Sequence, residues 1–403
     1  MTLLRAYRAE LDPTDVQRSS LFRHAGVDRF AYNWGRQRKQ EVRWMNQLPV
    51  PHVQTPTAID LHRELNLRKK WDLAWMYASS RCAPQQALRD LDRAYRNFFE
   101  GRAKFPRFHS RHRGVGSFRL TGSLAVHGWH IDLPRVGRVR LKERGYLPEQ
   151  IRILSATVSE RAGRWYVSIA VQEERPVPPP PPAEVVGVDL GIHVLATVSD
   201  GTVIENPEAL AHRLRKLKHL QREVARKEKG SQNREKAKRR LSRCHAKVAD
   251  LRKDALHKAT TRLARTKSVI VVETLRPENM LKNHHLARSL ADASFGEFTR
   301  QLEYKCQWYG STLVKADQFF PSTKRCSGCG SLKEMPLSER TYSCPSCGLV
   351  IDRDLNAARN LARVAASSVE TENACGGIGP HPAMGEPSRR NRNPASNVLA
   401  TVV

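Results

Sequence analysis

Long hydrophobic runs are missing from this chain of 403 residues. It has no stretch of about 18 consecutive apolar residues, the length that a helix needs to cross a bilayer, so no membrane-spanning segment is expected. The first residues, Met-Thr-Leu-Leu-Arg, lack the apolar core of a secretory signal. Cysteine is also scarce: there are eight, and Cys82, Cys244, Cys306 and Cys375 have no partner spacing. We therefore expect no disulfide framework, and a reducing cytoplasm is the expected compartment.

Acidic residues are too few to balance the basic ones. The chain has 40 Asp and Glu against 69 Lys and Arg, which gives a formal net charge of +29. Phosphates are the simplest source of compensating charge, so the expected partner is a nucleic acid. A ribosome-associated basic protein and a merely solubilising surface remain alternatives. The charge is spread from Arg5 to Arg392, with thirteen Lys and Arg against three Glu in residues 211–240. This spread favours an extended contact with a large polyanion.

The other four cysteines form two Cys-x-x-Cys pairs, which are separated by 14 residues. This spacing is typical of two turns that present four thiolates to Zn²⁺ in a closed, structural site. The predicted zinc ligands are Cys326, Cys329, Cys344 and Cys347. Two redox motifs or unrelated core thiols are the alternatives, but a redox motif would need one pair in a βαβ setting.

The N-terminal half changes from strand to helix and back to strand. Residues 3–10 are predicted as a strand, and helical patterning continues to about residue 100. The last helix places Leu88, Leu91, Tyr95, Phe98 and Phe99 on one apolar face, so these aromatics are expected in a core. From residue 105 the pattern becomes short β segments, which we expect to form a small β-barrel or sandwich. The segments are 117–120, 136–141, 151–158 and 165–171.

Prolines at 176 and 178–182 predict a stiff linker and a domain boundary. An apolar strand follows at 185–191 and carries Asp189, and residues 194–198 are expected to pair with it as a hairpin. Two highly charged helices are predicted at 207–229 and 232–266, with a break at Gly230-Ser231. A second β-branched strand, 268–273, ends in Glu273.

Carboxylates thus end two strands, and a third acidic site, Asp352 and Asp354, opens a helix beside the cysteine ribbon. Each acid alone could be a helix cap or a surface group. Together, on one α/β layer, they are the ligand set that a divalent-metal site for phosphoryl transfer requires, because Mg²⁺ prefers carboxylate oxygens.

These motifs in combination resemble TnpB, the family of transposon-associated RNA-guided nucleases with a RuvC-like domain. The resemblance covers residues 5–365 or so. It is carried by Gly187-Val-Asp189-Leu-Gly191, Glu273 after its strand, Phe295-Gly-Glu-Phe298, the four-cysteine ribbon and Asp352-Arg-Asp354-Leu-Asn356. Arg29-Phe-Ala-Tyr-Asn33 and Phe105-Pro-Arg-Phe108 resemble family landmarks in the N-terminal half.

The resemblance implies a multidomain α/β fold: an RNase H-like (RuvC) nuclease domain with an inserted Cys₄ zinc ribbon, preceded by a β-barrel wedge domain with a helical recognition insert. The implied boundaries are as follows: 1–12, first wedge strand; 13–104, helical recognition domain; 105–175, rest of the wedge; 176–182, linker; 183–320, nuclease domain with the helical hairpin 207–266; 321–349, zinc ribbon; 350–366, last nuclease segment; and 367–403, a disordered tail.

By the same resemblance, Asp189, Glu273 and Asp354 would be catalytic ligands of Mg²⁺ or Mn²⁺, with Asp354 preferred to Asp352 because it stands directly before x-Asn. The implied partners are a noncoding guide RNA, with one protein per RNA, and double-stranded target DNA. Three alternatives stay open: a compact type V CRISPR effector, a guide-dependent DNA-binding regulator without cleavage, and a transposase proper. The intact acidic set disfavours the regulator. No His-hydrophobic-His motif with a nucleophilic Tyr supports the transposase.

Overall fold

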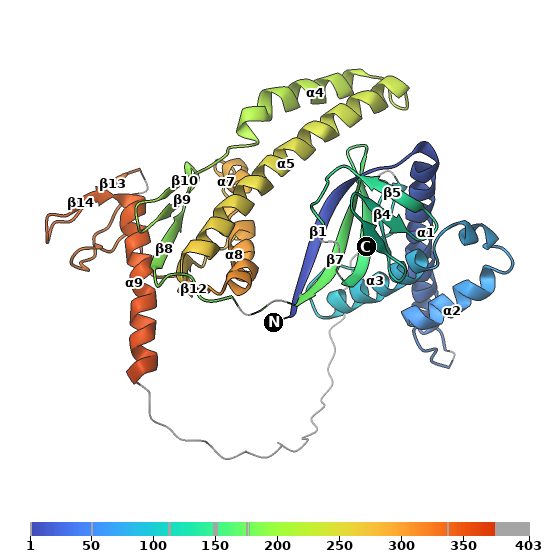
Figure 1. The fold of residues 1–403 in the computed structure, drawn as a ribbon, viewed down its shortest axis with the longest axis horizontal. Coiled ribbons are helices and arrows are strands. Elements are labelled where there is room, and N and C mark those ends of the chain that lie inside the picture. The colour runs from blue at the N-terminus through green and yellow to red at the C-terminus, as the bar shows by residue number, and fades with distance from the viewer. Residues whose placement is uncertain are drawn as a thin grey trace, which may run out of the picture.

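The computed structural model describes residues 2–49, 51–111, 114–147, 152–174, 176, 178–336 and 338–374, with side chains up to residue 365. It contains two α/β units, one from each half of the chain (Figure 1). The N-terminal unit is built on a seven-stranded antiparallel sheet in the order β2-β6-β7-β1-β5-β4-β3. The C-terminal unit has a five-stranded mixed sheet in the order β10-β9-β8-β11-β12 and a separate two-stranded ribbon. The mixed α/β content predicted from the sequence is confirmed.

The seven-stranded sheet is organised around its first strand, β1 (Thr2–Asp12). This strand pairs with β7 (Arg164–Glu174) from Thr2 opposite Glu174 to Leu11 opposite Trp165. Alternate side chains of β1, including Tyr7, Ala9 and Leu11, enter the core, as the period of a half-buried strand requires. The remaining strands are β2 (Ser117–Leu120), β3 (Ala125–His127), β4 (His130–Leu133), β5 (Gly137–Leu141) and β6 (Arg152–Arg161).

Three helices cover this sheet and extend beyond it: α1 (Asp15–Met45), α2 (Ala58–Arg68) and α3 (Cys82–Phe99). Helix α1 begins at a capping box in which Thr14 and Gln17 bond each other's backbone N–H, so the start at Asp12-Pro13-Thr14 is well specified. Leu88 and Leu91 of α3 are fully buried, as predicted. Phe99 does not join them: 76% of its surface is exposed. The expected core face therefore ends before the last turn of α3.

The five-stranded sheet of the C-terminal unit carries helices on both faces. Its strands are β8 (Val185–Leu190), β9 (Val194–Val198), β10 (Val203–Glu205), β11 (Val269–Glu273) and β12 (Thr312–Ala316). Strands β8, β11 and β12 pair in parallel, whereas β9 pairs antiparallel with both β8 and β10. Helices α5 (Gln232–Thr266) and α8 (Phe295–Tyr309) pack on one face through Leu256, Leu263 and Phe298, and α9 (Arg353–Ala374) packs on the other through Leu361. Two short helices, α6 (Pro277–Met280) and α7 (Ala287–Ala293), precede α8.

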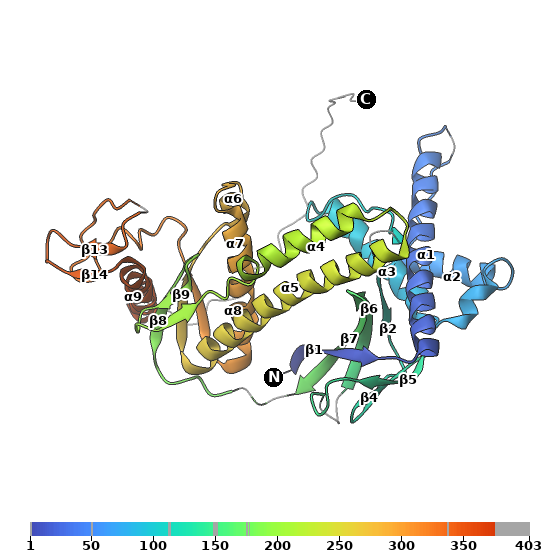
Figure 2. The same ribbon diagram turned by 90° about the horizontal axis from the view of Figure 1, so that it is seen from above.

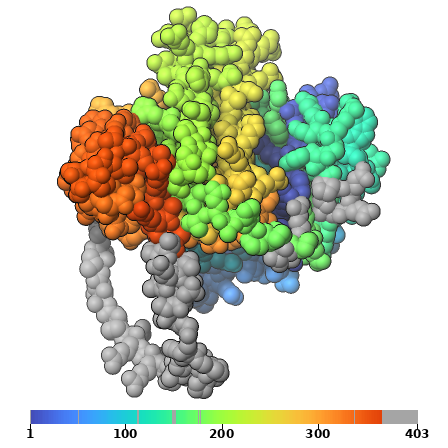
Figure 3. Space-filling model, turned by 60° about the vertical axis from the view of Figure 1, so that its left-hand side comes forward, coloured from blue at the N-terminus to red at the C-terminus, as the bar shows by residue number. Residues whose placement is uncertain are grey.

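Helices α4 (Leu214–Arg226) and α5 form a long hairpin that reaches from the C-terminal unit toward the N-terminal one (Figures 1 and 2). The turn between them contains Gly230 at φ +89°, a backbone conformation that favours glycine, so the predicted break is confirmed. Arg161, in the β6–β7 hairpin, pairs with Asp250 of α5 at 2.7 Å and so ties the two units together. In the space-filling view the hairpin is a ridge between the ribbon side, in orange, and the blue and cyan N-terminal half (Figure 3).

Several expectations need correction. The strands β3, β4, β10 and β12 were not predicted, because they are short or follow no clear alternation. Helix α9 continues to Ala374 and so crosses the boundary at 367 that was predicted for a tail; residues 375–403 lie outside the described part of the chain. Residues 178–182 carry no helix or strand, as expected of a proline linker. Within the described ranges, no helix has the length and hydrophobicity needed to span a bilayer.

Candidate functional site

Two of the three predicted acids lie side by side at one edge of the five-stranded sheet. Strands β8 and β11 are parallel neighbours, and Val188 pairs with Val272. Asp189 and Glu273 are the next residues of the two strands, at their carboxyl ends. The apolar residues before them hold the strands in the core, so each strand delivers its carboxylate to the same edge.

The third acid reaches this edge from helix α9, because a glycine lets the helix approach β8 closely. A Cβ atom on Gly187 would lie 2.5 Å from the Ala362 nitrogen and 2.8 Å from the Leu361 Cβ, and it would collide with the Ala358 carbonyl oxygen. Only a residue without a side chain fits there. Asp354 lies in the first turn of α9, about one turn before Ala358, and is therefore brought toward Asp189.

The electrostatics of Asp189 report the same convergence. Burial raises the pKa of Asp189 well above its ordinary value, the negative charges of Glu273 and Asp354 raise it further, and Arg353 lowers it. A buried carboxyl group beside two others is unfavourable as an anion unless a cation neutralises the cluster. The arrangement is thus suited to a divalent cation.

The other two acids are held by neighbouring groups. Glu273 accepts a hydrogen bond from the Ser322 hydroxyl. Asp354 forms ion pairs with Arg353 at 3.0 Å and with Arg340 at 3.7 Å. In the part of the chain that the structure describes, the four cysteines are the one group of three or more potential metal ligands whose donor atoms all lie within 4.8 Å. The carboxylates share an edge but are not drawn together as tightly.

Asp352 has a different position from Asp354. It closes strand β14 (Val350–Asp352) and caps α9, because its Oδ1 accepts from the backbone N–H of Asp354 at 2.9 Å and of Leu355 at 3.0 Å. These bonds satisfy two N–H groups that a helix start leaves without partners. Asp352 is therefore a helix cap, and the preference for Asp354 as the metal ligand agrees with this geometry.

The predicted cysteine site is assembled. The Sγ atoms of Cys326 and Cys347 are 3.7 Å apart, and those of Cys329 and Cys344 are 3.6 Å apart. A zinc tetrahedron with Zn–S bonds of about 2.3 Å has an edge of about 3.8 Å, so the four thiols fit this ion. A hydrogen bond with the Ser331 hydroxyl lowers the pKa of Cys344 to about 5, whereas the neighbouring thiols raise the pKa of Cys347 to about 11, as expected where sulfur atoms crowd together. The ribbon strands β13 (Thr341–Ser343) and β14 flank the second pair.

Two buried asparagines of α9, whose role the sequence did not reveal, fasten the ribbon to the acidic edge. Asn356 accepts from the Ser327 N–H at 2.8 Å and donates to the Arg325 carbonyl at 2.8 Å. Asn360 donates to the carbonyls of Ser322 and Arg325. Because Ser322 also donates to Glu273, one hydrogen-bonded network joins the four-cysteine ribbon, α9 and the acids. The only sequence signal was the presence of amides on an otherwise small, apolar helix face.

Comparison with known proteins identifies the family of this chain. Residues 168–284 match the family described as "Probable transposase" (OrfB, IS605), and residues 295–361 match a "Cas12f1-like, TNB domain". A Streptomyces pristinaespiralis protein described as "Putative RNA-guided DNA endonuclease" is 39% identical over 396 residues, covering 96% of this chain and 94% of that protein. This chain belongs to the TnpB (IS605 OrfB) family.

Further relatives, a solved structure and a domain model also match this chain. The Escherichia coli K12 protein described as "Putative RNA-guided DNA endonuclease InsQ" is 33% identical and covers 90% of this chain and 92% of its own length. A solved structure, "Cryo-EM structure of the Cas12f1-sgRNA-target DNA complex", covers 90% of this chain and 99% of its own at 12% identity, with a TM-score of 0.47. Residues 1–44 match a "Helix-turn-helix domain". In this TnpB-family chain they form instead one strand, β1, and one continuous helix, α1.

Proposed function

We propose that this protein is a metal-dependent, RNA-guided DNA endonuclease. The observation that carries the proposal is the convergence of Asp189, Glu273 and Asp354 at one sheet edge in a chain of this family. The relatives described as putative RNA-guided DNA endonucleases align over almost their whole length, so the comparison is with complete proteins. The sheet order, with three parallel strands flanked by an antiparallel pair, supports assignment of residues 183–320 and 350–366 to an RNase H-like (RuvC) domain.

The acids would hold Mg²⁺ or Mn²⁺, which supplies activation of a water and stabilisation of the leaving oxygen in phosphodiester hydrolysis. Asp189 and Glu273 are both held by strands, β8 and β11. Glu273 is oriented by Ser322, and Asp354 must exchange its contacts with Arg340 and Arg353 for the ion. The four cysteines would hold one structural Zn²⁺ that keeps residues 321–349 folded against α9.

The excess of positive charge suits a guide RNA bound before the DNA. Exposed basic residues cover the α4–α5 hairpin, which spans the two units, and the seven-stranded sheet would serve as the wedge beside a helical recognition domain. Base pairing between guide and target strand would read most of the site, and the protein would read a short flanking motif, as other RNA-guided nucleases do. One protein per RNA is sufficient for this arrangement.

A compact type V CRISPR effector is the second candidate, favoured by the Cas12f1-like match at residues 295–361. The neighbouring locus discriminates: a transposon end supports the first candidate and a repeat array the second. A DNA-binding regulator without cleavage is disfavoured because all three acids are present.

Retargeting tests the proposal. The protein is reconstituted with its guide RNA, and only the guide segment is then exchanged. Cleavage should move to a matching target that keeps the flanking motif, and RNA-free protein should be inactive. Cleavage of a specific duplex by RNA-free protein, or a cut that stays in place when the guide changes, would overturn the proposal.

A further inference from the structure

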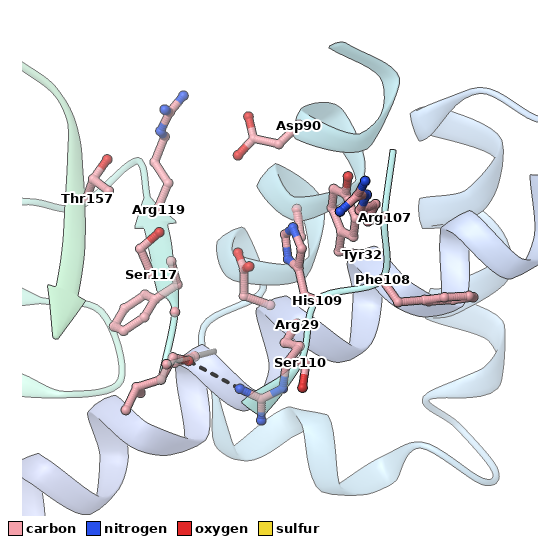
Figure 4. Close-up of a pocket in the computed structure, with 17 residues that line it drawn as sticks. Arg29, Tyr32, Asp90, Arg107, Phe108, His109, Ser110, Ser117, Arg119 and Thr157 are labelled. Atoms are coloured by element: carbon pink, nitrogen blue, oxygen red, sulfur yellow. Dashed lines mark hydrogen bonds between the residues drawn. The ribbon is translucent and has the colours of Figure 1, made fainter. Parts of the chain in front are cut away.

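A cavity of about 440 Å³ lies in the N-terminal unit, far from the acids in the sequence (Figure 4). Its wall is formed by α1, α3, residues 107–110 and 114–116, strand β2 and Thr157 of β6. The volume is within the range of about 300–1,000 Å³ that small-molecule sites occupy. In the close-up, Arg119 and Thr157 lie on one side of this space and Asp90 and His109 on the other.

The most unusual group on this wall is Asp28 of α1. Within the described part of the chain its carboxylate makes no hydrogen bond and no ion pair. Burial raises the pKa of Asp28 well above its ordinary value, the charge of Asp90 raises it further, and Arg119 and Arg29 lower it. Asp90 differs, because it is paired with Arg93 on its own helix. The residue is half-buried and lines the cavity, so its carboxylate can accept N–H groups from a ligand.

Arginines surround this acid. Arg29 donates to the Val115 carbonyl at 3.2 Å and keeps its other N–H groups for further contacts. The Nε of Arg119 is buried and has no hydrogen-bond partner. Arg107 also lines the cavity and is exposed. An acidic floor with basic residues around it is complementary to a molecule that carries a donor-rich edge and a phosphate.

The cavity also offers an aromatic surface. The rings of His109 and Tyr32 are stacked, with centroids 3.8 Å apart and an angle of 8° between the planes. Asn33 holds the backbone of His109 through two hydrogen bonds of 2.8 and 2.9 Å, so the ring is fixed in place. His109 is exposed and lines the cavity, so a further planar group can reach its ring.

We propose that this cavity binds one unpaired guanine nucleotide of a nucleic acid. Guanine is the base whose pairing edge places two N–H donors side by side, at N1 and at the 2-amino group, and a carboxylate such as Asp28 can accept both. The base stacks against His109, and Arg29 or Arg107 contacts the phosphate. The site rests on the proposed function only in requiring that the protein bind a nucleic acid, and it makes Asp28 a specificity residue rather than a catalytic one.

Mononucleotide binding to the full-length protein, freed of nucleic acid, tests the base directly. Calorimetry should show guanosine monophosphate bound at least tenfold more tightly than adenosine or inosine monophosphate, because inosine lacks the 2-amino donor. Asp28→Asn should lose this preference and gain one for xanthosine monophosphate, whose 2-carbonyl accepts from the new amide. Asp15→Asn, an exposed acid of the same helix, is the matched control and should change nothing.

A gain of xanthosine binding cannot come from misfolding, so the variant test remains informative. Equal binding of guanosine and adenosine monophosphates to the wild-type protein would overturn the proposal, as would an unchanged preference in Asp28→Asn. Loss of guanine preference in a protein that still cuts under RNA guidance leaves the proposed function standing. Guanine preference in a protein that never cuts DNA supports the guanine site and refutes the proposed function.

The source of the nucleotide is a separate arm of the experiment. 6-Thioguanine is placed at unpaired positions of the guide RNA in one assembly and of the target DNA in another. Photocross-links to peptides that contain Asp28 or His109 assign the site to whichever strand carries the probe. Absence of such cross-links from both assemblies would overturn the proposal.

Discussion

At the scale of single residues, Asp352 and Asp354 are two positions apart but have different structural roles. Asp352 turns its carboxylate back to the helix start, whereas Asp354 faces the edge that holds Asp189 and Glu273. A motif such as Asp-x-Asp cannot reveal this difference by itself. The two roles can be told apart only when the hydrogen-bond partners of each carboxylate are known.

Alanine substitutions should separate these roles. Asp189→Ala, Glu273→Ala and Asp354→Ala should each lower DNA cleavage by more than about 100-fold, since even outer-shell partners of a metal cost about 10–100-fold. DNA binding by the guide complex should remain, because the proposed role of these groups is to hold metal rather than nucleic acid. Gel-based cleavage and binding assays with Mg²⁺ measure both.

The matched control is Asp352→Ala. It should keep cleavage but lower the free energy of unfolding by about 1 kcal/mol, the usual loss for a helix cap. Retained cleavage in Asp189→Ala, or complete loss in a folded Asp352→Ala, would refute the assignment.

Gly187 is the residue that allows α9 to approach the sheet. Gly187→Ala should destabilise the C-terminal unit by about 1–3 kcal/mol or more, because backbone atoms of Ala358 and Ala362 cannot move aside as a side chain can. It should also lower the rate of DNA cleavage, because Asp354 lies on α9 and moves with the displaced helix.

Gly26→Ala is the comparison for that variant. Gly26 lies inside α1, where an added Cβ would meet nothing within 4 Å. The substitution should be neutral or stabilise by about 0.5–1 kcal/mol through helix propensity. Urea unfolding of both variants gives the result, and equal behaviour of the two would contradict the close approach of α9.

At the scale of elements, the four-cysteine ribbon is anchored to α9 by the hydrogen bonds of Asn356 and Asn360. One Zn²⁺ per chain should resist mild chelation, and Cys344→Ser should make residues 322–351 the first site of limited proteolysis, because zinc binding supplies folding free energy to so small a unit. The rate of DNA cleavage should fall as well, because Ser322 lies in this segment and positions Glu273. Cys82→Ser, a cysteine outside the cluster, should keep its zinc. Active protein without zinc in elemental analysis would disprove this role.

Helices α5 and α8 are joined by a buried lysine. The Lys305 ammonium donates to the His257 carbonyl at 2.9 Å, to Thr260 Oγ1 at 2.6 Å and to Gln301 Oε1 at 3.2 Å, and only 3% of the residue is exposed. All three donors are satisfied, yet burial lowers the pKa of Lys305 to about 8.

The stability of this junction should therefore depend on pH. Below about pH 8 both the folded and the unfolded chain hold the proton, and the folded state bears the full cost of the buried charge. Between about pH 8 and 10.5 the folded state releases the proton first, so stability rises with pH, by at most about 1.4 kcal/mol per pH unit.

Lys305→Met removes this titration. The difference in unfolding free energy between wild type and variant, measured in urea at pH 7, 8, 9 and 9.5, should shift in favour of the wild type as the pH rises. The difference cancels the titration of the other groups. A difference that stays constant over this range would show that Lys305 titrates normally.

Which elements were predictable follows from how their residues are stabilised. Strands β8 and β11 are β-branched runs buried in a parallel sheet, and Thr14 and Ser231 are side-chain caps, so local sequence specifies them. Strands β10 and β12 lie at the edges of their sheet and depend on the neighbour they pair with, which no local pattern reports. The acids could be predicted because a carboxylate at the end of an apolar strand is costly. The contact at Gly187 and the amide contacts of α9 depend on packing between segments more than 20 residues apart in sequence, which no local pattern reports.

At the scale of the whole molecule, a net charge of +29 makes the chain repel itself, and a bound polyanion relieves this repulsion. The hairpin α4–α5 bridges the two units, and the β6–β7 turn contacts it through Arg161. RNA bound along the hairpin would thus touch both halves and fix their relative position. The nuclease edge and the N-terminal unit would then be aligned by the RNA rather than by the protein alone, which explains why RNA-free protein should be inactive.

Salt dependence tests whether the hairpin binds the RNA directly. Arg215, Lys218 and Arg222 are exposed on α4, whose buried side is formed by Leu217 and Leu220. Replacing the three by Gln should weaken guide RNA binding and reduce the slope of log K against log salt by about 0.7–0.9 for each phosphate that is no longer neutralised. The control removes the same charge outside the hairpin, with Arg138→Gln, Lys315→Gln and Lys324→Gln, three exposed basic residues already paired with acids. If net charge alone attracts the RNA, both triple variants should bind it equally weakly; if the hairpin itself holds the RNA, the slope should fall in the α4 variant alone.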